Sequence, residues 1–275
     1  MTVAERLRAA VAELGPDAST ARLDAELLMA AALGISRSAM LIGQMREAAP
    51  ASFEALWARR VAGEPVAYIL GHAGFWDLDL AVTPAVLIPR GDSETLIRTA
   101  QDLCASQSPA RILDCGTGSG ALLLAALTLF PGSEGVGIDR SPEALAVASV
   151  NAASHGLAGR SRIIARDWSV PGWADDLGRF ELILANPPYV EDDAALEPVV
   201  RDHEPAGALF AGPEGLDAYR VLIPQLRQLL TNSGVAILEI GASQAAQVTA
   251  IASESGFRVD LRRDLGERPR ALILR

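Results

Sequence analysis

The chain has 275 residues, of which half are apolar and 21% are charged, so we expect one large domain or a large and a small one, and we exclude a disordered or low-complexity protein. Its 34 acidic side chains outnumber the 24 basic ones, and the formal charge of −10 opposes general attraction to nucleic-acid phosphates. All the basic residues are arginine, which excludes Schiff-base chemistry on lysine and the phosphate-binding lysine of a P-loop.

Residues 1–64 predict a small bundle of four or five short helices. Apolar side chains recur there at helical spacing, as at Val3, Leu7 and Val11, and glycine and proline separate the segments. The N-terminus carries charge early and lacks an apolar stretch typical of a signal peptide, and no stretch elsewhere is long enough to span a bilayer. We therefore expect a cytoplasmic protein with reduced thiols.

The pattern changes at Pro65, where apolar and acidic side chains come close to alternating, as in the run from Phe75 to Val82. This pattern predicts a β-hairpin or extended linker over residues 65–92. Helical spacing returns over residues 93–105.

Beyond residue 105, strands and helices alternate, which predicts an α/β fold with a largely parallel sheet covered on both faces. The last two of seven strands are separated only by a short loop, so one of them must run antiparallel and the sheet is mixed. The predicted strands are 111–115, 135–139, 162–165, 182–185, 235–240, 258–262 and 271–274. The predicted helices are 121–130, 142–155, 216–230 and 243–255.

A glycine-rich turn directly follows the first of these strands and directly precedes a helix. Glycine lets the backbone turn sharply and lets a ligand approach closely, although tight turns also use it for steric reasons alone. Asp139 ends the next strand, where a carboxylate can accept hydrogen bonds from two ribose hydroxyls or, alternatively, cap the following helix. The turn consists of Gly116, Thr117, Gly118, Ser119 and Gly120. Together these residues predict a nucleoside cofactor, and the glycine spacing disfavours a dinucleotide.

Asp167 and Trp168 follow the third strand, at the sheet edge where ligands bind in α/β proteins. A carboxylate there can accept from an exocyclic amine, and an indole can flank a purine ring. The tryptophan could equally belong to the core.

The strongest motif is the tetrapeptide Asn186, Pro187, Pro188 and Tyr189 after the fourth strand. The asparagine side chain offers a carbonyl acceptor, and a proline has a carbonyl but no N–H, so the turn presents acceptors without a competing backbone donor. This arrangement suits a substrate NH2 group, with Tyr189 closing the pocket by aromatic contact. Alternatively, the tetrapeptide is only a rigid turn without a binding role.

Metal chemistry is not expected. The two cysteines and three histidines lack metal-ligand spacing, and no histidine adjoins the Asn-Pro-Pro-Tyr tetrapeptide, so His203 is assigned to structure or surface. These residues are Cys104, Cys115, His72, His155 and His203.

The glycine turn, Asp139 and the tetrapeptide together resemble the class I S-adenosylmethionine methyltransferases that modify planar nitrogens. Three further segments, 65–94, 209–225 and 238–244, are similar to the bacterial release factor glutamine methyltransferases, the PrmC/HemK family. The similarity extends over nearly the whole chain and is weakest in the N-terminal bundle. Gly91 and Cys115 differ from the residues that family members usually have at these positions. Neither residue is one of the proposed reacting groups.

This resemblance implies a Rossmann-like class I methyltransferase fold and transfer of a methyl group from S-adenosyl-L-methionine to N5 of the glutamine in the Gly-Gly-Gln motif of class I peptide chain release factors. It implies that residues 116–120 wrap the methionine part of the cofactor, that Asp139 binds its ribose and that Trp168, beside Asp167, binds its adenine. Asn186, which also borders the cofactor, and Pro187 would act in catalysis. Residues 186–189 would hold the glutamine side chain.

The implied organisation is a substrate-recognition domain over 1–64, the linker over 65–92 and the methyltransferase domain over 93–275. We expect a monomer that binds neither nucleic acid nor membrane directly.

Three rival functions differ in what they leave unexplained. An adenine-N6 DNA methyltransferase would also use the Asn-Pro-Pro-Tyr turn, but it needs a basic target-recognition region and a way to flip the base, which this acidic chain does not clearly offer. A nicotinamide dehydrogenase would leave that turn idle. A non-catalytic interaction protein would leave the whole cofactor pattern without purpose.

Overall fold

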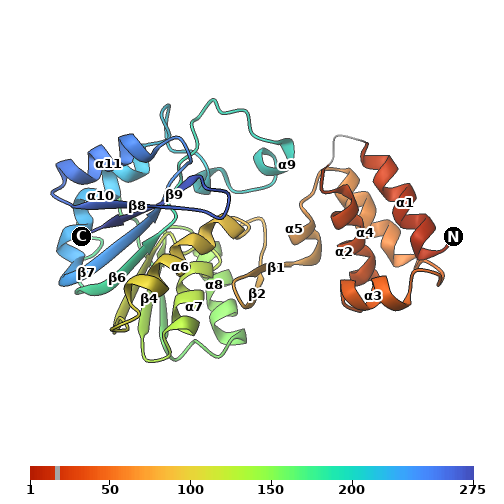
Figure 1. Ribbon diagram of the computed structural model, residues 1–275, viewed down its shortest axis with the longest axis horizontal. Helices are drawn as coiled ribbons and strands as arrows, with labels where there is room; N and C mark the ends of the chain where they lie inside the picture. The colour runs from red at the N-terminus through yellow and green to blue at the C-terminus, as the bar shows by residue number, and fades with distance from the viewer. Residues whose placement is uncertain (16–18) are drawn as a thin grey trace. The chain divides into compact units, whose positions relative to one another are not determined.

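The computed structural model describes residues 1–15 and 19–275, and the described chain divides into two compact units (Figure 1). The first unit consists of Met1–His72 together with Leu196–His203, and the second of Ala73–Ala195 and Glu204–Arg275.

The first unit is a helical bundle with its own apolar core. Leu7, Leu28 and Phe53 are fully buried in it, and the Phe53 and Trp57 rings stack with centroids 5.8 Å apart. Thr2 caps the first helix with a capping box. The Thr2 hydroxyl accepts from the Glu5 N–H, and the Glu5 carboxylate accepts from the Thr2 N–H. The helices are α1 (Val3–Leu14), α2 (Ala21–Leu33), α3 (Arg37–Gly43), α4 (Ser52–Val61), α5 (Val66–Leu70) and α9 (Pro198–Arg201).

Helix α5 lies where the sequence predicted the start of an extended linker, so the first unit continues past residue 64 to His72. Pro65 is the N-cap of this helix, a position at which the missing N–H of proline costs nothing because the first amides of a helix have no partner there. The Ile69 side chain is buried against the bundle core. The rest of the predicted linker contains the expected hairpin, β1 (His72–Phe75) and β2 (Leu78–Ala81).

Within the described residues, the second unit contains a seven-stranded sheet in the order β5-β4-β3-β6-β7-β9-β8. β9 pairs antiparallel with both of its neighbours, whereas the remaining pairs are parallel, which confirms the predicted mixed sheet. The strands are β3 (Arg111–Cys115), β4 (Glu134–Asp139), β5 (Ser161–Ala165), β6 (Phe180–Ala185), β7 (Leu230–Glu239), β8 (Val259–Arg263) and β9 (Pro269–Leu274). The helices are η1 (Gly91–Ser93), α6 (Glu94–Leu103), α7 (Ala121–Leu129), α8 (Pro142–Ser154), η2 (Ala206–Ala208), α10 (Asp217–Leu229) and α11 (Ala245–Glu254).

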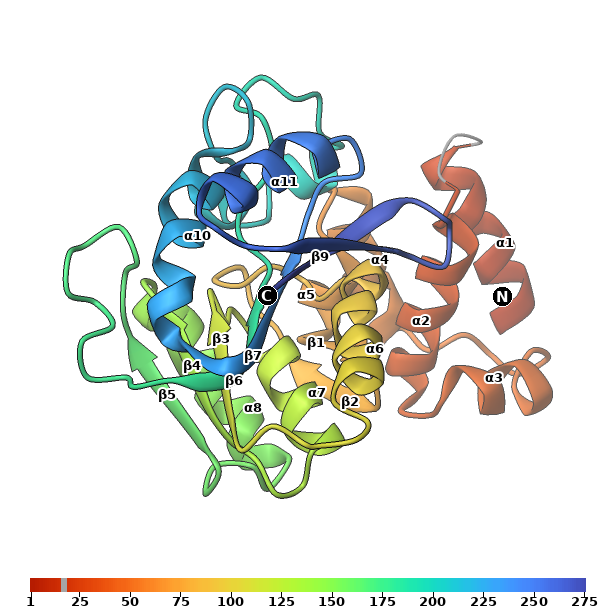
Figure 2. The ribbon, with the colours of Figure 1, turned by 60° about the vertical axis from the view of Figure 1, so that its left-hand side comes forward.

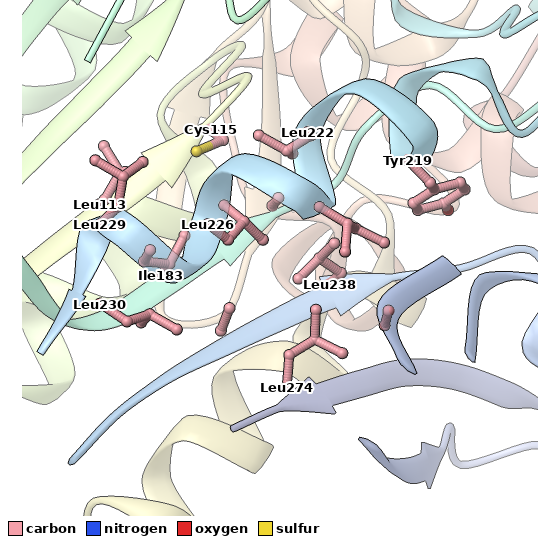
Figure 3. Close-up of a cluster of buried hydrophobic side chains, with 14 of the residues drawn as sticks. Leu113, Cys115, Ile183, Tyr219, Leu222, Leu226, Leu229, Leu230, Leu238 and Leu274 are labelled. Carbon is pink, nitrogen blue, oxygen red and sulfur yellow. The ribbon is translucent and has the colours of Figure 1, made fainter. Parts of the chain in front are cut away.

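Two apolar cores, one on each face, hold this sheet. Helices α10 and α11 cover one face, and α6, α7 and α8 cover the other (Figure 2). Figure 3 shows Leu222 and Leu226 of α10 among Ile183 of β6 and Leu238 of β7, all of them buried. Because both faces are covered, the inner strands β6, β7 and β9 are mostly buried and largely apolar. The carboxyl ends of the parallel strands form the edge at which α/β proteins bind ligands.

No single helix in the described part of the chain is long and apolar enough to cross a membrane. Taken together, α2 and α3 meet the length and composition that a membrane span requires, but the two helices are bent by 87° at the break between them.

Candidate active site

The glycine-rich turn follows β3 and leads into α7. The N–H groups of Gly116 and Thr117 both donate to the carbonyl of Ile138 in β4, at 2.9 and 2.8 Å, which fixes the turn to the neighbouring strand. Gly116 has φ +74°, and a Cβ on it would lie 3.1 Å from the Trp168 ring, so glycine is needed there for both conformation and space. At Gly118 a Cβ would meet nothing within 4 Å, so this residue opens onto free space.

Asp139 ends β4 and faces this turn. Its Oδ2 accepts from the Gly118 N–H and its Oδ1 from the Ser141 N–H, both at 3.0 Å. Each carboxylate oxygen has a second lone pair, so an anchored carboxylate of this kind can still accept from two vicinal hydroxyls. These carboxylate acceptors therefore fit the ribose hydroxyls of a nucleoside.

Asp167 and Trp168 follow β5 at the same edge. The Asp167 Oδ1 accepts from the hydroxyl and the N–H of Ser169, at 2.7 and 2.8 Å, and these bonds hold the pKa of the carboxyl below its usual range. The Trp168 ring contacts the Gly116 turn and also packs against the core, while its carbonyl accepts from Gln225 at 3.0 Å. The indole thus belongs both to the core and to the site.

The Asn-Pro-Pro-Tyr turn leaves the end of β6. The Asn186 Nδ2 donates to the Ser93 hydroxyl at 3.3 Å, and the Tyr189 carbonyl accepts from the Gln244 side chain at 2.9 Å. Val190 continues into a parallel bridge with Phe210. The turn is therefore fixed at both ends by residues distant in sequence.

These segments enclose one pocket of about 470 Å³, which lies within the range of about 300–1,000 Å³ that is typical of small-molecule sites. Segments 85–90 and 205–212 complete its wall, and the buried Glu204 pairs with Arg90 and accepts from the Ile88 N–H at 3.2 Å. The predicted site residues in the lining are Gly116, Thr117, Gly118, Ser119, Asp139, Asp167, Trp168, Asn186 and Pro188.

Three predicted site residues lie beside the pocket and not in its lining. Gly120, with φ +85°, is the N-cap of α7, and Pro187 is buried. Tyr189 was expected to close the pocket by aromatic contact; instead its hydroxyl points away to Glu239, where it donates to Oε1 at 3.2 Å. Burial and the nearby Glu239 carboxyl raise the pKa of this phenol.

No role was predicted for Glu239, a buried carboxyl that accepts a hydrogen bond from Tyr189 of the Asn-Pro-Pro-Tyr turn. Glu239, the last residue of β7, is 1% exposed, and burial raises the pKa of its carboxyl. Its backbone carbonyl accepts from the Tyr219 hydroxyl at 2.8 Å. Glu239 and Gln244 belong to segment 238–244 and Ser93 to segment 65–94, so the resemblance marked these segments without assigning roles to the residues.

Asp114, in β3 just before the turn, is a second buried carboxyl without a predicted role. Its Oδ2 accepts from the Thr117 hydroxyl at 2.7 Å and the Leu123 N–H at 3.3 Å, whereas its Oδ1 has no hydrogen-bond partner among the described residues. Burial raises the pKa of this carboxyl to about 7. Through its hydrogen bond to Thr117, the Asp114 carboxyl holds the glycine-rich turn in place.

No histidine of the described chain lines the pocket. Among residues 1–15 and 19–275, no group of three or more histidine, cysteine, aspartate or glutamate side chains is placed to hold a metal ion. His203 belongs to the first unit, where its Cε1 would lie 3.5 Å from a Cβ on Gly63.

Two family models match the chain, namely the PrmC N-terminal domain over residues 5–71 and a methyltransferase domain over residues 106–225. Among solved structures of similar fold are the hMettl16 catalytic domain in complex with the MAT2A 3′UTR hairpin 6 and a methyltransferase from Pyrococcus furiosus. The first has a TM-score of 0.57 at 16% identity and covers 80% of this chain and 81% of its own. The second has a TM-score of 0.51 at 16% identity, with 79% and 95% covered. These two likenesses concern the fold alone.

Curated relatives are much closer in sequence. The release factor glutamine methyltransferase of Rhodospirillum rubrum is 42% identical over 260 residues, which cover 92% of this chain and 78% of the relative. That of Bradyrhizobium diazoefficiens is 41% identical over 285 residues, covering 100% and 92%. Together with the matches to the PrmC N-terminal domain and a methyltransferase domain, this similarity means that the chain belongs to the release factor glutamine methyltransferase family.

Proposed function

We infer that this protein transfers a methyl group from S-adenosyl-L-methionine to N5 of the glutamine in the Gly-Gly-Gln motif of class I peptide chain release factors. Membership of the release factor glutamine methyltransferase family supports the reaction. The observation that carries the inference is that Asp139 and Trp168, which suit a nucleoside, and Asn186, which suits an NH2 group, line the same pocket.

The cofactor-binding residues are a proposal built on the geometry of this pocket. Asp139 accepts from the ribose hydroxyls, the Trp168 ring flanks the adenine, and Asp167 accepts from the exocyclic amine of the adenine. The glycine turn wraps the methionine part, with Asn186 at the border of the reacting centre. When bound, the cofactor supplies a methyl group on a sulfonium, which is an electrophile without further activation. The proposed turn residues are Gly116, Thr117, Gly118, Ser119 and Gly120.

The catalytic task of the protein is to make a poor nucleophile react, because an amide nitrogen shares its lone pair with the carbonyl. We propose that the Asn186 side-chain oxygen and the Pro187 carbonyl accept the two N–H groups of the substrate amide. These acceptors orient the nitrogen toward the methyl group and favour a more pyramidal nitrogen. Pro188 lines the glutamine site, and Tyr189, beside the pocket, supports the turn through its hydrogen bond to Glu239. The proton leaves after transfer, so no general base is required.

We also propose separate roles for the two parts of the chain. The N-terminal helices recognise the release factor, and residues 93–275 perform the transfer. The match of the PrmC N-terminal domain to residues 5–71, and a first unit that continues to His72, support a recognition domain longer than residues 1–64. Residues 73–92 would then remain as the linker.

We further propose that the enzyme acts as a monomer in the cytoplasm, where release factors act on ribosomes, and that it binds its protein substrate without direct contact to nucleic acid or membrane. The formal charge of −10 supports the expectation for nucleic acid. The alternative of adenine-N6 DNA methylation gains no support from the curated relatives, which are named for release factor glutamine.

The function is tested by incubating the protein and S-adenosyl-L-methionine with an unmodified release factor, beside an adenine-containing DNA duplex, followed by peptide mass spectrometry. We expect a mass gain of one CH2 group on the Gly-Gly-Gln peptide, and none on a release factor whose motif glutamine is replaced by alanine. Methylated DNA beside an untouched release factor would overturn the inferred substrate.

A further inference from the structure

The turn between the last two strands lies at the same edge of the sheet as the pocket. β9 runs antiparallel to β7, and the N–H of Ile240, just beyond the end of β7, donates to the Arg270 carbonyl near the start of β9 at 2.9 Å. Residues 264–268 connect β8 to β9 and are called the hairpin turn below. They therefore lie where the parallel strands end.

The order of the strands places the hairpin turn on the substrate side of the pocket. The residues proposed for the nucleoside, Asp139 and Trp168, come from the ends of β4 and β5, whereas Asn186 follows β6 on the other side of β3. In that direction the next strands are β7, β9 and β8. A protein–protein contact covers about 800 Å² on each partner. A protein that brings its glutamine to Asn186 therefore reaches over this part of the edge.

Ion pairs hold the hairpin turn next to the wall of the pocket. The Asp92 carboxylate pairs with Arg268 and with the buried Arg270, both at 3.0 Å. Asp92 belongs to η1, and Ser93 of the same short helix lines the pocket, as does Arg90 just before it. The turn is thus connected directly to residues of the site.

Asp264 gives the hairpin turn a defined conformation. Its Oδ1 accepts from the N–H groups of Gly266 and Arg268, at 2.8 and 3.0 Å, and its Oδ2 accepts from the Arg268 Nε at 3.0 Å. Between these anchored residues, the Leu265 side chain is 87% exposed. It packs against almost nothing, so the fold itself does not require a leucine there. The turn presents one apolar side chain to solvent in a fixed position.

Positive charge surrounds this exposed leucine. Residues 258–275 contain six arginines and three acidic residues, although the formal charge of the whole chain is −10. Arg262 and Arg263 are exposed on β8, where charged side chains also protect an edge strand from pairing with another sheet. That protection does not explain Leu265. An apolar tip beside positive side chains is complementary to an apolar recess bordered by acidic groups.

We propose that the hairpin turn is a docking contact for the folded release factor, with Leu265 in an apolar recess bordered by acidic side chains while the motif glutamine occupies the pocket. The inference rests on the proposed function, because the occupant is the protein that carries the methylated glutamine. Leu265 does not line the pocket within the described chain, so it touches neither cofactor nor reacting atoms. The contact therefore contributes to binding of the protein substrate and leaves the transfer step unchanged.

The test replaces Leu265 in the full-length protein and measures KM and kcat separately. Leu265→Asp should raise the KM for an unmodified release factor by roughly 10- to 30-fold, since an apolar anchor gives way to a charge that the acidic border repels. The kcat at saturating release factor and the calorimetric affinity for S-adenosylhomocysteine should keep their wild-type values. Val150→Asp, the same kind of change at an exposed position of α8, is the matched control and should alter none of the three.

A cross-linking measurement identifies the occupant. Leu265→Cys, labelled with a benzophenone maleimide, is illuminated with the release factor, and the cross-linked peptides are identified by mass spectrometry. Labelled wild type gives the background from the partly buried Cys104, and labelled Val150→Cys gives that of another exposed position. Only position 265 should form cross-links to the release factor above this background.

A wild-type KM in Leu265→Asp would overturn the proposal, as would a kcat well below the wild-type value. Cross-links from position 265 only to a second copy of the enzyme, or only within the chain, would also overturn it. If thermal unfolding shows that Leu265→Asp does not fold, Leu265→Ala replaces it, with an expected rise in KM of about 3- to 10-fold. A wild-type enzyme that leaves the release factor unmodified refutes the proposed function, whereas an active wild type and an equally active Leu265→Asp refute the docking contact alone.

Discussion

At the scale of single residues, the proposed roles separate cofactor binding from methyl transfer. Asp139, at the end of β4, is anchored by two backbone N–H groups, whereas Asn186 follows β6 and its amide is held by Ser93. β3 lies between β4 and β6, so the two functions come from strands on either side of the glycine turn. Substitutions at the two positions should therefore affect different steps.

Asn186→Ala should retain cofactor binding and lose methyl transfer, with kcat lower by roughly 100-fold or more, since one preorganised acceptor at the reacting nitrogen is removed. Transfer is measured by mass spectrometry and binding by calorimetry. The matched control is Asn232→Ala, the same change at an exposed position of β7. Full activity of Asn186→Ala would refute the role given to Asn186.

Asp139→Ala should weaken cofactor binding first, by about 2–4 kcal/mol, because it removes a charged acceptor for two hydroxyls. Calorimetric titration with S-adenosyl-L-methionine measures the loss. Asp260→Ala, which removes an exposed carboxylate paired with Arg275, should leave the affinity unchanged. An Asp139 variant with wild-type affinity would mean that the ribose is bound elsewhere.

Asp114 predicts a pH dependence of stability. Its folded-state pKa of about 7 lies above its ordinary value of 3.8, so the folded protein holds the proton more tightly than the unfolded chain. The stability associated with this group is complete below pH 4 and is lost as the pH rises to and beyond 7, at about 1.4 kcal/mol per unit of pKa difference at most.

Asp114→Asn should remove that loss, because an amide carries no charge to bury and its oxygen can still accept from Thr117 and Leu123. The measurement is the free energy of unfolding by urea at several pH values between 4 and 8. If the two proteins show parallel pH profiles, the carboxyl does not titrate in this range.

At the scale of elements, the tetrapeptide depends on a loop that packs against it. A Cβ on Gly215 would lie 2.3 Å from the Tyr189 carbonyl oxygen and 2.8 Å from the Gln244 Nε2, and the residue has φ +66°. The glycine therefore permits a close backbone approach that no other residue allows.

Gly215→Ala should lower both stability and kcat, since the Tyr189 carbonyl must move and the turn moves with it. Gly156→Ala provides the matched control, because Gly156 has a similar φ of +69° but open space around a Cβ. The control should cost only the strain of the left-handed conformation, about 1–2 kcal/mol, with kcat unchanged. Equal kcat values in the two variants would contradict the packing role of Gly215.

The same scale explains what the sequence allowed us to predict. The strand over 111–115 was predicted with its observed bounds because its apolar residues are followed directly by the glycine-rich turn. β7 begins at Leu230, five residues before the predicted start, because the polar, partly or fully exposed residues 231–233 that follow Leu230 interrupt that signal. Helix α9 has four residues and is too short to show a helical period.

The lining of the pocket could be inferred from local motifs, since glycines, aspartates and the tetrapeptide each follow a strand. The positions of Ser93 and Glu239 could not, because Ser93 reaches Asn186 and Glu239 reaches Tyr189 only through the tertiary structure, and neither carries a local pattern. Likewise, the direction of the Tyr189 hydroxyl depends on the end of β7, which sequence spacing does not place.

At the scale of the whole molecule, the two units have separate apolar cores. A ligand that binds only one folded unit stabilises that unit, by about 2.7 kcal/mol at a hundredfold excess over Kd. Scanning calorimetry with added S-adenosylhomocysteine should therefore raise the melting transition of the second unit and leave that of the first, which contains the stacked Phe53 and Trp57, in place. A single transition that moves as one would mean that the two units unfold cooperatively.

The first unit is assembled from two stretches of sequence, Met1–His72 and Leu196–His203. The polypeptide consequently changes unit three times, so this unit is not a detachable N-terminal appendage. A truncated enzyme that starts after His72 would still carry an eight-residue stretch deprived of its packing partners. For the same reason, exchanging recognition units between relatives requires transplanting two stretches encoded far apart, and the shorter one must match the longer one in every chimera.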